Sequence, residues 1–262
     1  GLNTASCQTG NSCVTPDTLI QPGGLPPSDP SAWTADQLRA KLTAAGKDDM
    51  IVLTGHFSAG SLVAADYKTG LTATEIATAA ADYTGAVVLA LGCHGGFSIP
   101  GSDVLQDVSP DPDWAKAFLR RNAAGFVAAS GYAYGSTTTI EWGERVFVDL
   151  SRQLRTGPDP VALGKALVAA KRAYLAKWAD QLDGYDEKTL TQMTLYGLPM
   201  MRVNMPGQRL PVETDASIVT ATAPVPDGPG AGFGLNRTAG VAVLPTVTIN
   251  QAPLQDLSNN ST

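Results

Sequence analysis

Reactive side chains are few in this chain, which has two histidines and three cysteines among its 262 residues. Cys93 lies in the segment Gly-Cys-His-Gly-Gly (residues 92–96), directly after the apolar run 86–91. A free cysteine is often a small buried apolar residue, but a core position does not need three flanking glycines. Glycines let a substrate backbone approach closely, so Cys93 is the candidate nucleophile.

A second apolar run, residues 50–54, ends in the same way and leads through Gly55 to His56. Continuous apolar runs closed by glycine are typical of strands buried on both faces, as in a parallel sheet. Ligands bind at the carboxyl ends of such strands. A catalytic histidine must be His56 or His94, because the chain has no others.

The segment between the two runs decides how they are arranged. Residues 72–83 are rich in alanine and predict a helix, with Glu75 in its first turn. A strand–helix–strand connection of this length makes the two strands parallel, so their carboxyl ends share one edge of the sheet. His56 and Cys93 are therefore predicted to face each other. A thiol beside an imidazole supports nucleophilic catalysis, with His56 as general acid and base.

The remaining patterns continue an α/β order. Thr34 and Gly46 are predicted to cap and stop a helix over 35–45. Further helices are predicted over 112–124, 139–155, 160–182 (capped by Asp159-Pro160) and 186–196, strands over 125–130 and 200–204, and a loop at the sheet edge over 131–139.

The two ends of the chain differ in amino-acid composition from its centre. Residues 1–33 contain five prolines and predict an irregular arm or linker, followed by an α/β domain over 34–206. Residues 207–262 are rich in proline and glycine and predict a linker with β-type segments that leads to downstream domains of a longer chain. Cys7 and Cys13 are close together in the sequence of the arm. They form either a disulfide, which would suit an extracytoplasmic protein, or a reduced pair.

Composition excludes several functional classes. The net charge is −6 and no cluster of basic residues offsets it, which argues against a nucleic-acid surface. No apolar run approaches the ~18 residues that a membrane-spanning helix needs. The histidines and Cys93 lack the spacing of a structural zinc site, so no metal ligand is assigned. The acidic segment 103–113 lacks the ligand spacing of a known calcium loop, so a structural calcium ion has no support from spacing.

Four motifs follow one another along the chain. They are strand–Gly-His56, strand–Gly-Cys93-His-Gly-Gly, strand–Ser-Gly-Tyr-Ala-Tyr-Gly135 and Leu195-Tyr-Gly-Leu-Pro-Met200. Their order resembles the gingipain-type cysteine peptidases of the caspase-like superfamily, and the resemblance covers residues 34–206. It implies a caspase-like three-layer α/β sandwich with a mainly parallel central sheet flanked by helices. It also implies a secreted or cell-surface cysteine endopeptidase that acts on peptides or proteins through a thioester on Cys93 and requires no cofactor.

The same resemblance implies further site residues. In this superfamily the oxyanion hole is formed by the amide of the nucleophile and the amide that follows the histidine. These are Cys93 and Phe57 here, in turns that also contain Gly55 and Gly92. The predicted substrate cleft contains side chains from the segments that follow the sheet strands. The alternative is that these side chains only pack at the rim of the sheet or form the solvated first turn of a helix. They are His94, Tyr132, Tyr134, Glu141 and Trp142.

Two alternatives to an active peptidase remain open at this point. Phe57 stands where the family usually has glycine, and residues 1–33 contain no strand, which favours a catalytically inactive caspase-like surface or binding module. Cys93-His94-Gly95 also resembles the elbow of DJ-1/PfpI-like hydrolases. That fold requires a helix directly after the elbow, whereas residues 97–102 are predicted to form a loop.

Overall fold

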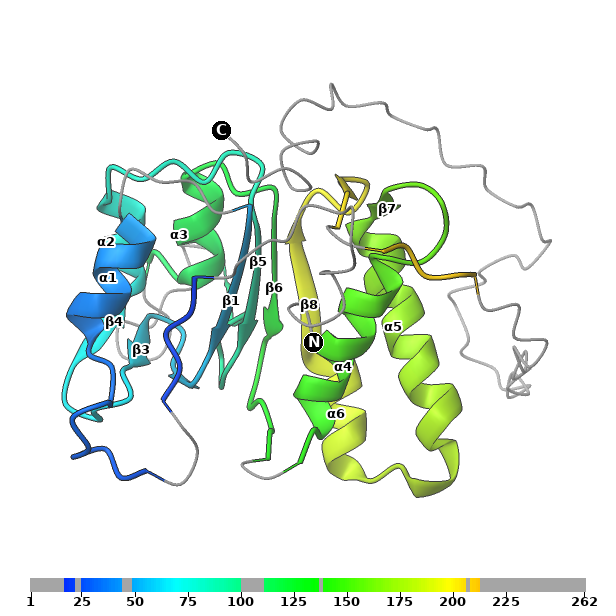
Figure 1. Cartoon of the computed structure of the whole chain (residues 1–262), viewed down its shortest axis with the longest axis horizontal. Coiled ribbons are helices and arrows are strands. Elements are labelled where there is room, and N and C mark those ends of the chain that lie inside the picture. Colours follow the sequence, from blue (N-terminus) through cyan, green and yellow to red (C-terminus); the bar gives the residue numbers. More distant parts are fainter. Residues whose placement is uncertain are drawn as a thin grey trace, which may run out of the picture.

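The structure is a computed structural model that describes residues 17–21, 25–43, 49–99, 111–136, 139–205 and 208–212. Within these ranges the chain forms an α/β sandwich (Figure 1). Cys7 and Cys13, most of the N-terminal arm and the segment 213–262 lie outside the described residues. The predicted arm, cysteine pair and C-terminal extension therefore stay predictions.

A four-stranded sheet forms the centre, in the order β1-β5-β6-β8. Its strands are β1 (Met50–Thr54), β5 (Val87–Leu91), β6 (Gly125–Ala129) and β8 (Met193–Gly197). β1, β5 and β6 run parallel, and β8 is antiparallel to β6. Every residue of β5 and β6 is buried, which explains why their sequences are uniformly apolar rather than alternating. The predicted parallel arrangement is confirmed.

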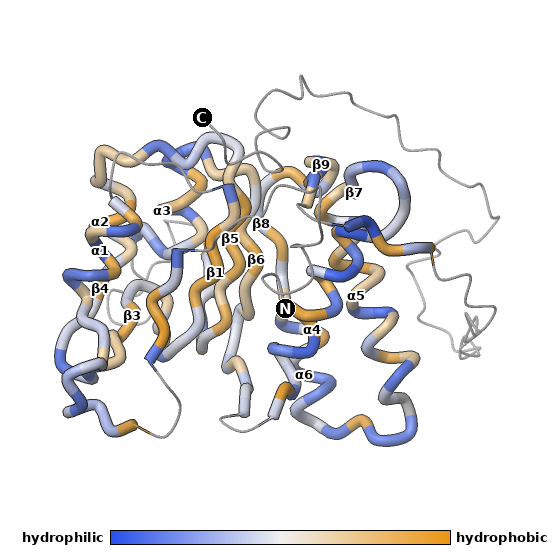
Figure 2. Tube along the Cα trace, viewed as in Figure 1, coloured by the Kyte–Doolittle hydropathy of each residue, from blue (hydrophilic) through white to orange (hydrophobic). Residues whose placement is uncertain are grey.

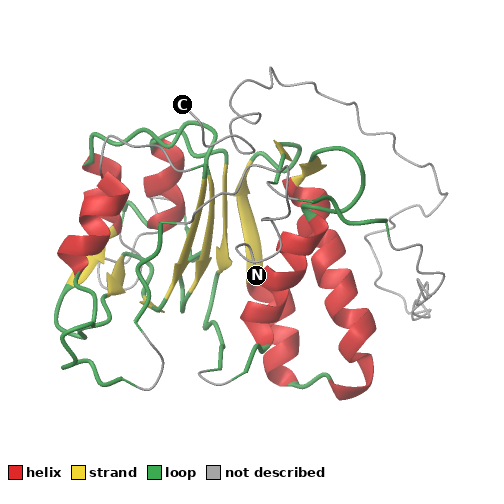
Figure 3. Ribbon diagram, in the orientation of Figure 1, coloured by secondary structure: helices red, strands yellow, loops and turns green. Residues whose placement is uncertain are grey.

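Helices cover both faces of this sheet (Figures 1 and 3). One face carries α1 (Ala35–Thr43), α2 (Ala73–Thr78) and α3 (Trp114–Arg120). The other carries α4 (Trp142–Gln153), α5 (Leu163–Trp178), followed by a single 3-10 turn at Ala179–Gln181, and α6 (Gly184–Gln192). The predicted three-layer sandwich is therefore confirmed.

The two layers of core follow from the alternation of side chains along each strand. Val88 of β5 faces the cluster under α1 to α3, whereas Val87 and Leu89 face the cluster under α4 and α5. Figure 2 shows apolar residues gathered on the central strands, whereas polar residues are more frequent in the helices and loops around them. This core holds the strand ends in place, and the strand ends hold the candidate site.

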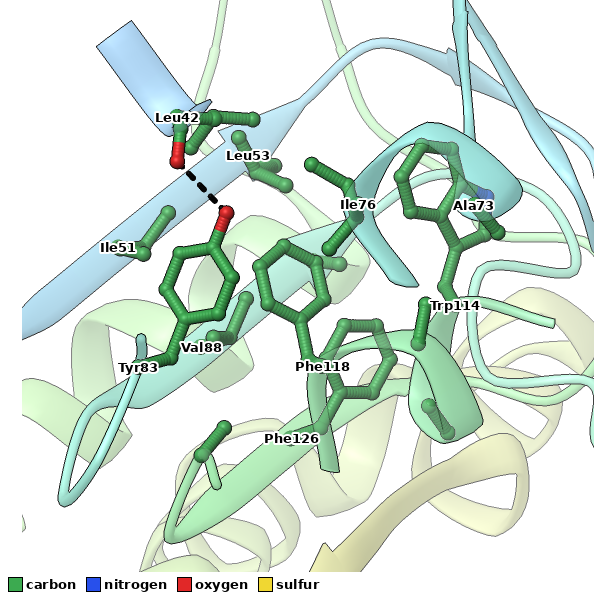
Figure 4. Packing of buried hydrophobic residues seen from close by; sticks show 14 of the residues in the cluster. Leu42, Ile51, Leu53, Ala73, Ile76, Tyr83, Val88, Trp114, Phe118 and Phe126 are labelled. Atoms are coloured by element: carbon green, nitrogen blue, oxygen red, sulfur yellow. Dashed lines mark hydrogen bonds between the residues drawn. The ribbon is translucent and has the colours of Figure 1, made fainter. Parts of the chain in front are cut away.

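Several large aromatic side chains pack in the first cluster (Figure 4). Phe118 of α3 stacks on Phe126 of β6 with ring centroids 5.7 Å apart. The hydroxyl of the buried Tyr83 donates to the Leu42 carbonyl at 2.6 Å, which ties α1 to the segment before β5. Trp114 is fully buried, and its indole N–H donates to the Ser58 carbonyl at 3.0 Å. That bond anchors the chain just after His56.

A small antiparallel sheet, which was not predicted from the sequence, follows β1. Its strands are β2 (His56–Phe57), β3 (Ser61–Val63) and β4 (Gly70–Thr72). The crossover helix α2 then starts after Thr72, whose side chain accepts from the Glu75 amide in a capping box. It ends at Thr78, so the predicted helix over 72–83 is too long. Strands of two or three residues have too few positions for a visible alternation.

The C-terminal half departs most from prediction. The predicted helix over 186–196 is wrong in its second part, because α6 ends at Gln192 and the next five residues are the sheet strand β8. The predicted strand at 200–204 is reduced to β9 (Arg202–Val203), which pairs with β7 (Val161–Ala162) outside the central sheet. Only Met193 of β8 is buried and three of its five residues are half-buried, so a strand this short shows no pattern that separates it from helix.

Several predicted helix boundaries also shift. α3 begins after Asp113, whose carboxylate accepts from the Lys116 amide at 2.9 Å, rather than at Pro112. α4 begins after Glu141 rather than at 139, and α5 begins at Leu163 rather than after Asp159-Pro160, because β7 intervenes. Gly46, the predicted stop of α1, lies outside the described residues. In the described part of the chain, no helix is long and apolar enough to cross a membrane.

Candidate active site

His56 and Cys93 come from the ends of neighbouring parallel strands. In the register of β1 and β5, Thr54 lies opposite Leu91, and the Gly55 amide donates to the Leu91 carbonyl at 3.1 Å. His56 and Cys93 each stand two residues beyond these paired strand ends, at the same edge of the sheet. The structure therefore brings the two predicted residues to one edge, as the parallel crossover requires.

The two turns that carry these residues touch at Gly92. A methyl group added at Gly92 would lie 2.2 Å from Cδ2 of Phe57 and 2.7 Å from the carbonyl oxygen of Gly55. Real side chains do not approach so closely, so only glycine fits at this position. The Phe57 ring is itself held in the core by an edge contact with Trp114, at 5.5 Å between centroids. The turn after β5 is thus packed directly against the turn after β1.

We define residues 92–97 as the cysteine turn. Backbone hydrogen bonds fasten it to the segment around the end of β6, because the His94 amide donates to Gly131 O at 2.7 Å and the Gly96 amide to Ala129 O at 2.8 Å. The Tyr196 hydroxyl of β8 donates to the Gly96 carbonyl. His94 has a φ of 57°, the left-handed conformation that closes the turn. Cys93 is therefore displayed on a rigid element.

The Cys93 side chain is half-buried and its thiol is free. Sγ donates to the carbonyl oxygen of Ala133 at 3.6 Å, in the loop after β6. A partly exposed thiol on a turn is the setting in which reactive cysteines occur, in contrast to inert cysteines of apolar cores. The placement supports a reactive role over a packing role.

The His56 ring is exposed, and its Nε2 lies 2.6 Å from the hydroxyl oxygen of Tyr67. The two rings meet edge to face, with centroids 5.2 Å apart. Tyr67 belongs to the loop between β3 and β4 and was not identified from the sequence. No local signal could have found it, because the contact depends on the small antiparallel sheet that folds this loop back over His56.

The predicted oxyanion positions are not equivalent in the structure. The Gly55 amide already donates to Leu91, so it is not available to a substrate oxygen, and Gly92 serves the close packing of the two turns. The Cys93 amide has no hydrogen bond to any other described residue. The assignment of Cys93 and Phe57 as the donors stays a prediction, and the Gly55 amide is bonded to the neighbouring strand end.

The predicted cleft residues fall into two groups. Next to the cysteine turn, the rings of His94 and Tyr132 lie 4.6 Å apart, and 62% of the Tyr132 surface is exposed. After β6, the Tyr134 ring meets Trp142 at 6.4 Å and Tyr185 at 4.6 Å. Tyr185 comes from α6 and was missed, because its distance along the chain hides its contact with Tyr134. We call the second group, Tyr134, Trp142 and Tyr185, the aromatic rim; it begins next to Ala133, whose carbonyl accepts from the Cys93 thiol.

Glu141 has local partners. Its backbone amide donates to Glu144 at 3.0 Å within the capping box of α4, and its carboxylate accepts from the Thr139 hydroxyl at 2.9 Å. Glu144 also accepts from the Ser136 amide at 3.3 Å. These bonds hold the loop before α4 in shape, which is the first-turn role that acidic residues commonly take.

Metal binding finds no support among the described residues, which contain no group of three or more His, Cys, Asp or Glu side chains placed to hold an ion. Most of the acidic segment 103–113 lies outside them. The expectation that no cofactor is needed, and the alternative of a calcium ion, both stay predictions.

Comparison with known proteins supplies the family. The sequence profile of Peptidase family C25 matches residues 31–204, more than half of the chain. The chain belongs to peptidase family C25. This confirms the resemblance to gingipains and with it the caspase-like α/β fold. Among curated proteins the comparison finds no match.

Two solved structures are similar to this C25 chain. One is the crystal structure of the Arg-specific cysteine proteinase gingipain R (RgpB), with 16% identity and a TM-score of 0.45, covering 67% of this chain and 37% of that one. The other is a complex of the pro- and mature domains of Porphyromonas gingivalis RgpB, with 14% identity, a TM-score of 0.46 and coverages of 67% and 38%. The C25 chain therefore spans less than two fifths of these proteins.

Family membership also bears on the DJ-1/PfpI-like alternative. That fold places a helix directly after its cysteine elbow, whereas residues 94–99 of this chain form a turn and an irregular segment. The alternative is therefore not supported.

Proposed function

We propose that this C25 chain is a cysteine endopeptidase in which Cys93 is the nucleophile and His56 the general acid and base. The observation that carries the proposal is the position of the two residues, each two positions past a paired end of adjacent parallel strands in a chain of a cysteine peptidase family. Localisation outside the cytoplasm is part of the same proposal and rests on the family resemblance alone.

The proposed reaction has two halves. The Cys93 sulfur attacks the carbonyl carbon of the peptide bond while its proton passes to His56, and the amides of Cys93 and Phe57 donate to the oxygen that becomes negative. The C–N bond then breaks, and His56 gives its proton to the leaving amine. Water, deprotonated by His56, attacks the thioester on Cys93 and releases the acid product.

In the resting arrangement the two side chains have other partners. The thiol donates to Ala133 and the imidazole contacts Tyr67. Proton transfer between them therefore requires Sγ to turn from Ala133 toward His56 as substrate binds. Catalytic hydrogen bonds are often long or absent in the free enzyme and tighten only in the complex.

The aromatic rim suggests what flanks the scissile bond. Tyr134, Trp142 and Tyr185 offer ring faces and edges to a substrate side chain, whereas the Glu141 carboxylate is already used in the loop. Aromatic surfaces bind both apolar side chains and the cationic groups of lysine and arginine. A peptide panel should therefore contain aromatic, aliphatic and basic residues before the cleavage point.

Thiol labelling tests the proposal directly. An irreversible peptidyl inhibitor directed at thiols should modify Cys93, identified by mass spectrometry, and should block turnover of the panel. Cys93→Ala should abolish both. His56→Ala should reduce labelling by about 10²–10⁴-fold, the usual contribution of a general acid–base group.

His94→Ala separates the two histidines. The proposed pair predicts that this variant still labels at Cys93, with an altered KM at most. Loss of labelling in His94→Ala together with normal labelling in His56→Ala would contradict the proposal and assign the neighbouring histidine as the partner of Cys93.

The competing function is an inactive binding module of the same fold. The observation that favours it is that Sγ and Nε2 are each hydrogen-bonded elsewhere. A folded protein that neither turns over the panel nor reacts with the inhibitor faster than free cysteine would support this alternative and refute the peptidase.

A further inference from the structure

Tyr67 makes a specific contact that the proposed reaction has not yet used. Its hydroxyl oxygen lies 2.6 Å from Nε2 of His56, and Tyr67 is the only hydrogen-bond partner of that ring among the described residues. Tyr67 is 58% exposed, so burial in the core does not account for its position. Its aromatic contact is also with His56, at 5.2 Å between centroids. The side chain of Tyr67 is thus directed at one imidazole.

The loop that carries Tyr67 is braced on both sides. Oδ1 of Asp66 accepts from the amides of Lys68 and Thr69, both at 3.0 Å. The Asp66 amide donates to the Trp33 carbonyl at 3.2 Å, and the Thr69 hydroxyl accepts from the first amide of α1 at 2.8 Å. These bonds connect the loop to the start of α1, so the position of the Tyr67 hydroxyl is set by the fold.

The backbone of Tyr67 has an unusual conformation. Its φ is 53°, the left-handed conformation that tyrosine adopts rarely and at a cost. The Tyr67 amide donates to Ala64 O at 3.0 Å, which closes the turn that produces this conformation. An exposed residue under such strain suggests a role, and the role open to this side chain is its contact with His56.

The contact with Tyr67 assigns different roles to the two ring nitrogens of His56. Because Nε2 is occupied by Tyr67, Nδ1 is the nitrogen left to exchange a proton with Cys93. A neutral imidazole carries one proton, so Nδ1 can accept the thiol proton only when Nε2 holds the ring proton and donates it to the Tyr67 oxygen. If Tyr67 donated to Nε2 instead, Nδ1 would already be protonated and could accept nothing.

We propose that Tyr67 is a positioning residue that fixes the orientation and tautomer of His56, with Nε2–H donated to Tyr67 and Nδ1 free for Cys93. This inference rests on the proposed peptidase function for its consequence in catalysis. The contact itself is independent of that function. In this proposal Tyr67 acts through the imidazole, which it contacts directly, and takes no part in bond making or breaking.

Nitrogen-15 NMR of the histidine rings tests the tautomer without any substrate. The chain has two histidines, so His56→Ala assigns both signals and His94 is an internal reference. At a pH where the ring is neutral, His56 should be in the Nε2–H form. Tyr67→Phe should lower the ratio of Nε2–H to Nδ1–H by roughly three- to tenfold, the change that one ordinary hydrogen bond supplies, while His94 stays the same.

Turnover supplies the second readout. Tyr67→Phe keeps the ring and the turn, so kcat should fall by about three- to tenfold with KM within twofold of the wild type. Lys68→Ala is the matched control in the same loop, because its amide still bonds Asp66, and it should leave both constants unchanged. Thermal unfolding of each variant checks that the fold is retained.

The outcomes separate the two proposals. An unchanged tautomer ratio in Tyr67→Phe, or a wild-type His56 in the Nδ1–H form, overturns the positioning role whatever the activity. An unchanged kcat in Tyr67→Phe, in an enzyme that Cys93→Ala inactivates, overturns its catalytic consequence alone. Absence of turnover in the wild type with the expected tautomer shift refutes the peptidase and leaves the Tyr67 contact standing.

Discussion

Substitution of Gly92 by alanine probes the contact between the two turns of the site. The new methyl group would lie 2.2 Å from the Phe57 ring and 2.7 Å from the Gly55 carbonyl, both well inside van der Waals contact. The Phe57 ring is held against Trp114 and the carbonyl belongs to the backbone, so neither yields freely. Overpacking of this kind costs about 1–3 kcal/mol.

The expected loss corresponds to a fall in the unfolding temperature of roughly 2–12 °C, at about 2–4 °C per kcal/mol for a domain of this size. Activity should fall further than stability, because relief of the clash moves the backbone around His56 relative to Cys93. A displacement of about 1 Å at a catalytic group can reduce the rate by about a hundredfold. Calorimetry and kcat/KM measured on the same sample give the two values.

Gly95 provides the matched control in the same turn. A methyl group there would meet its nearest atoms at 3.5 to 3.8 Å, which are ordinary contacts. Gly95→Ala should therefore change stability by less than about 1 kcal/mol and activity by only a few fold. If the two variants behaved alike in both assays, the close packing of the turns would not be what positions His56, and the reasoning would fail.

Two further predictions concern hydrogen bonds that support the site. Tyr196→Phe removes the bond to Gly96 and should lower the free energy of unfolding by about 1 kcal/mol. Burial raises the pKa of Tyr196, so its contribution to stability is complete below pH 10 and is lost as the pH rises further. Denaturant unfolding of both proteins from pH 8 to 11 checks this. The amides of Thr69 and Lys68 lower the pKa of Asp66. The loop around Tyr67 should therefore stay ordered at pH 3.8, the ordinary carboxyl pKa, and loosen only as the pH falls through the lower pKa of the native state. Hydrogen exchange of the Thr69 amide measures this, and exchange that is unchanged in Asp66→Ala would contradict it.

The sequence determined the core of the site because its signals are local. Two continuous apolar runs closed by glycine predict buried strands, and an alanine-rich crossover makes them parallel. From these two facts alone His56 and Cys93 arrive at one sheet edge, and the sheet register bears this out. The glycines around Cys93 were interpreted as room for a substrate backbone, and the structure adds that Gly92 is needed for the close contact with Phe57.

Tertiary structure decided which groups surround that pair. Tyr67 reaches His56 through a sheet whose strands are too short to produce a pattern, and Tyr185 reaches Tyr134 across about 50 residues of chain. The strand β8 was hidden because an edge strand of five residues does not differ from helix in composition. Strand ends follow from local sequence, whereas the hydrogen-bond partners of the reactive atoms depend on contacts between distant segments.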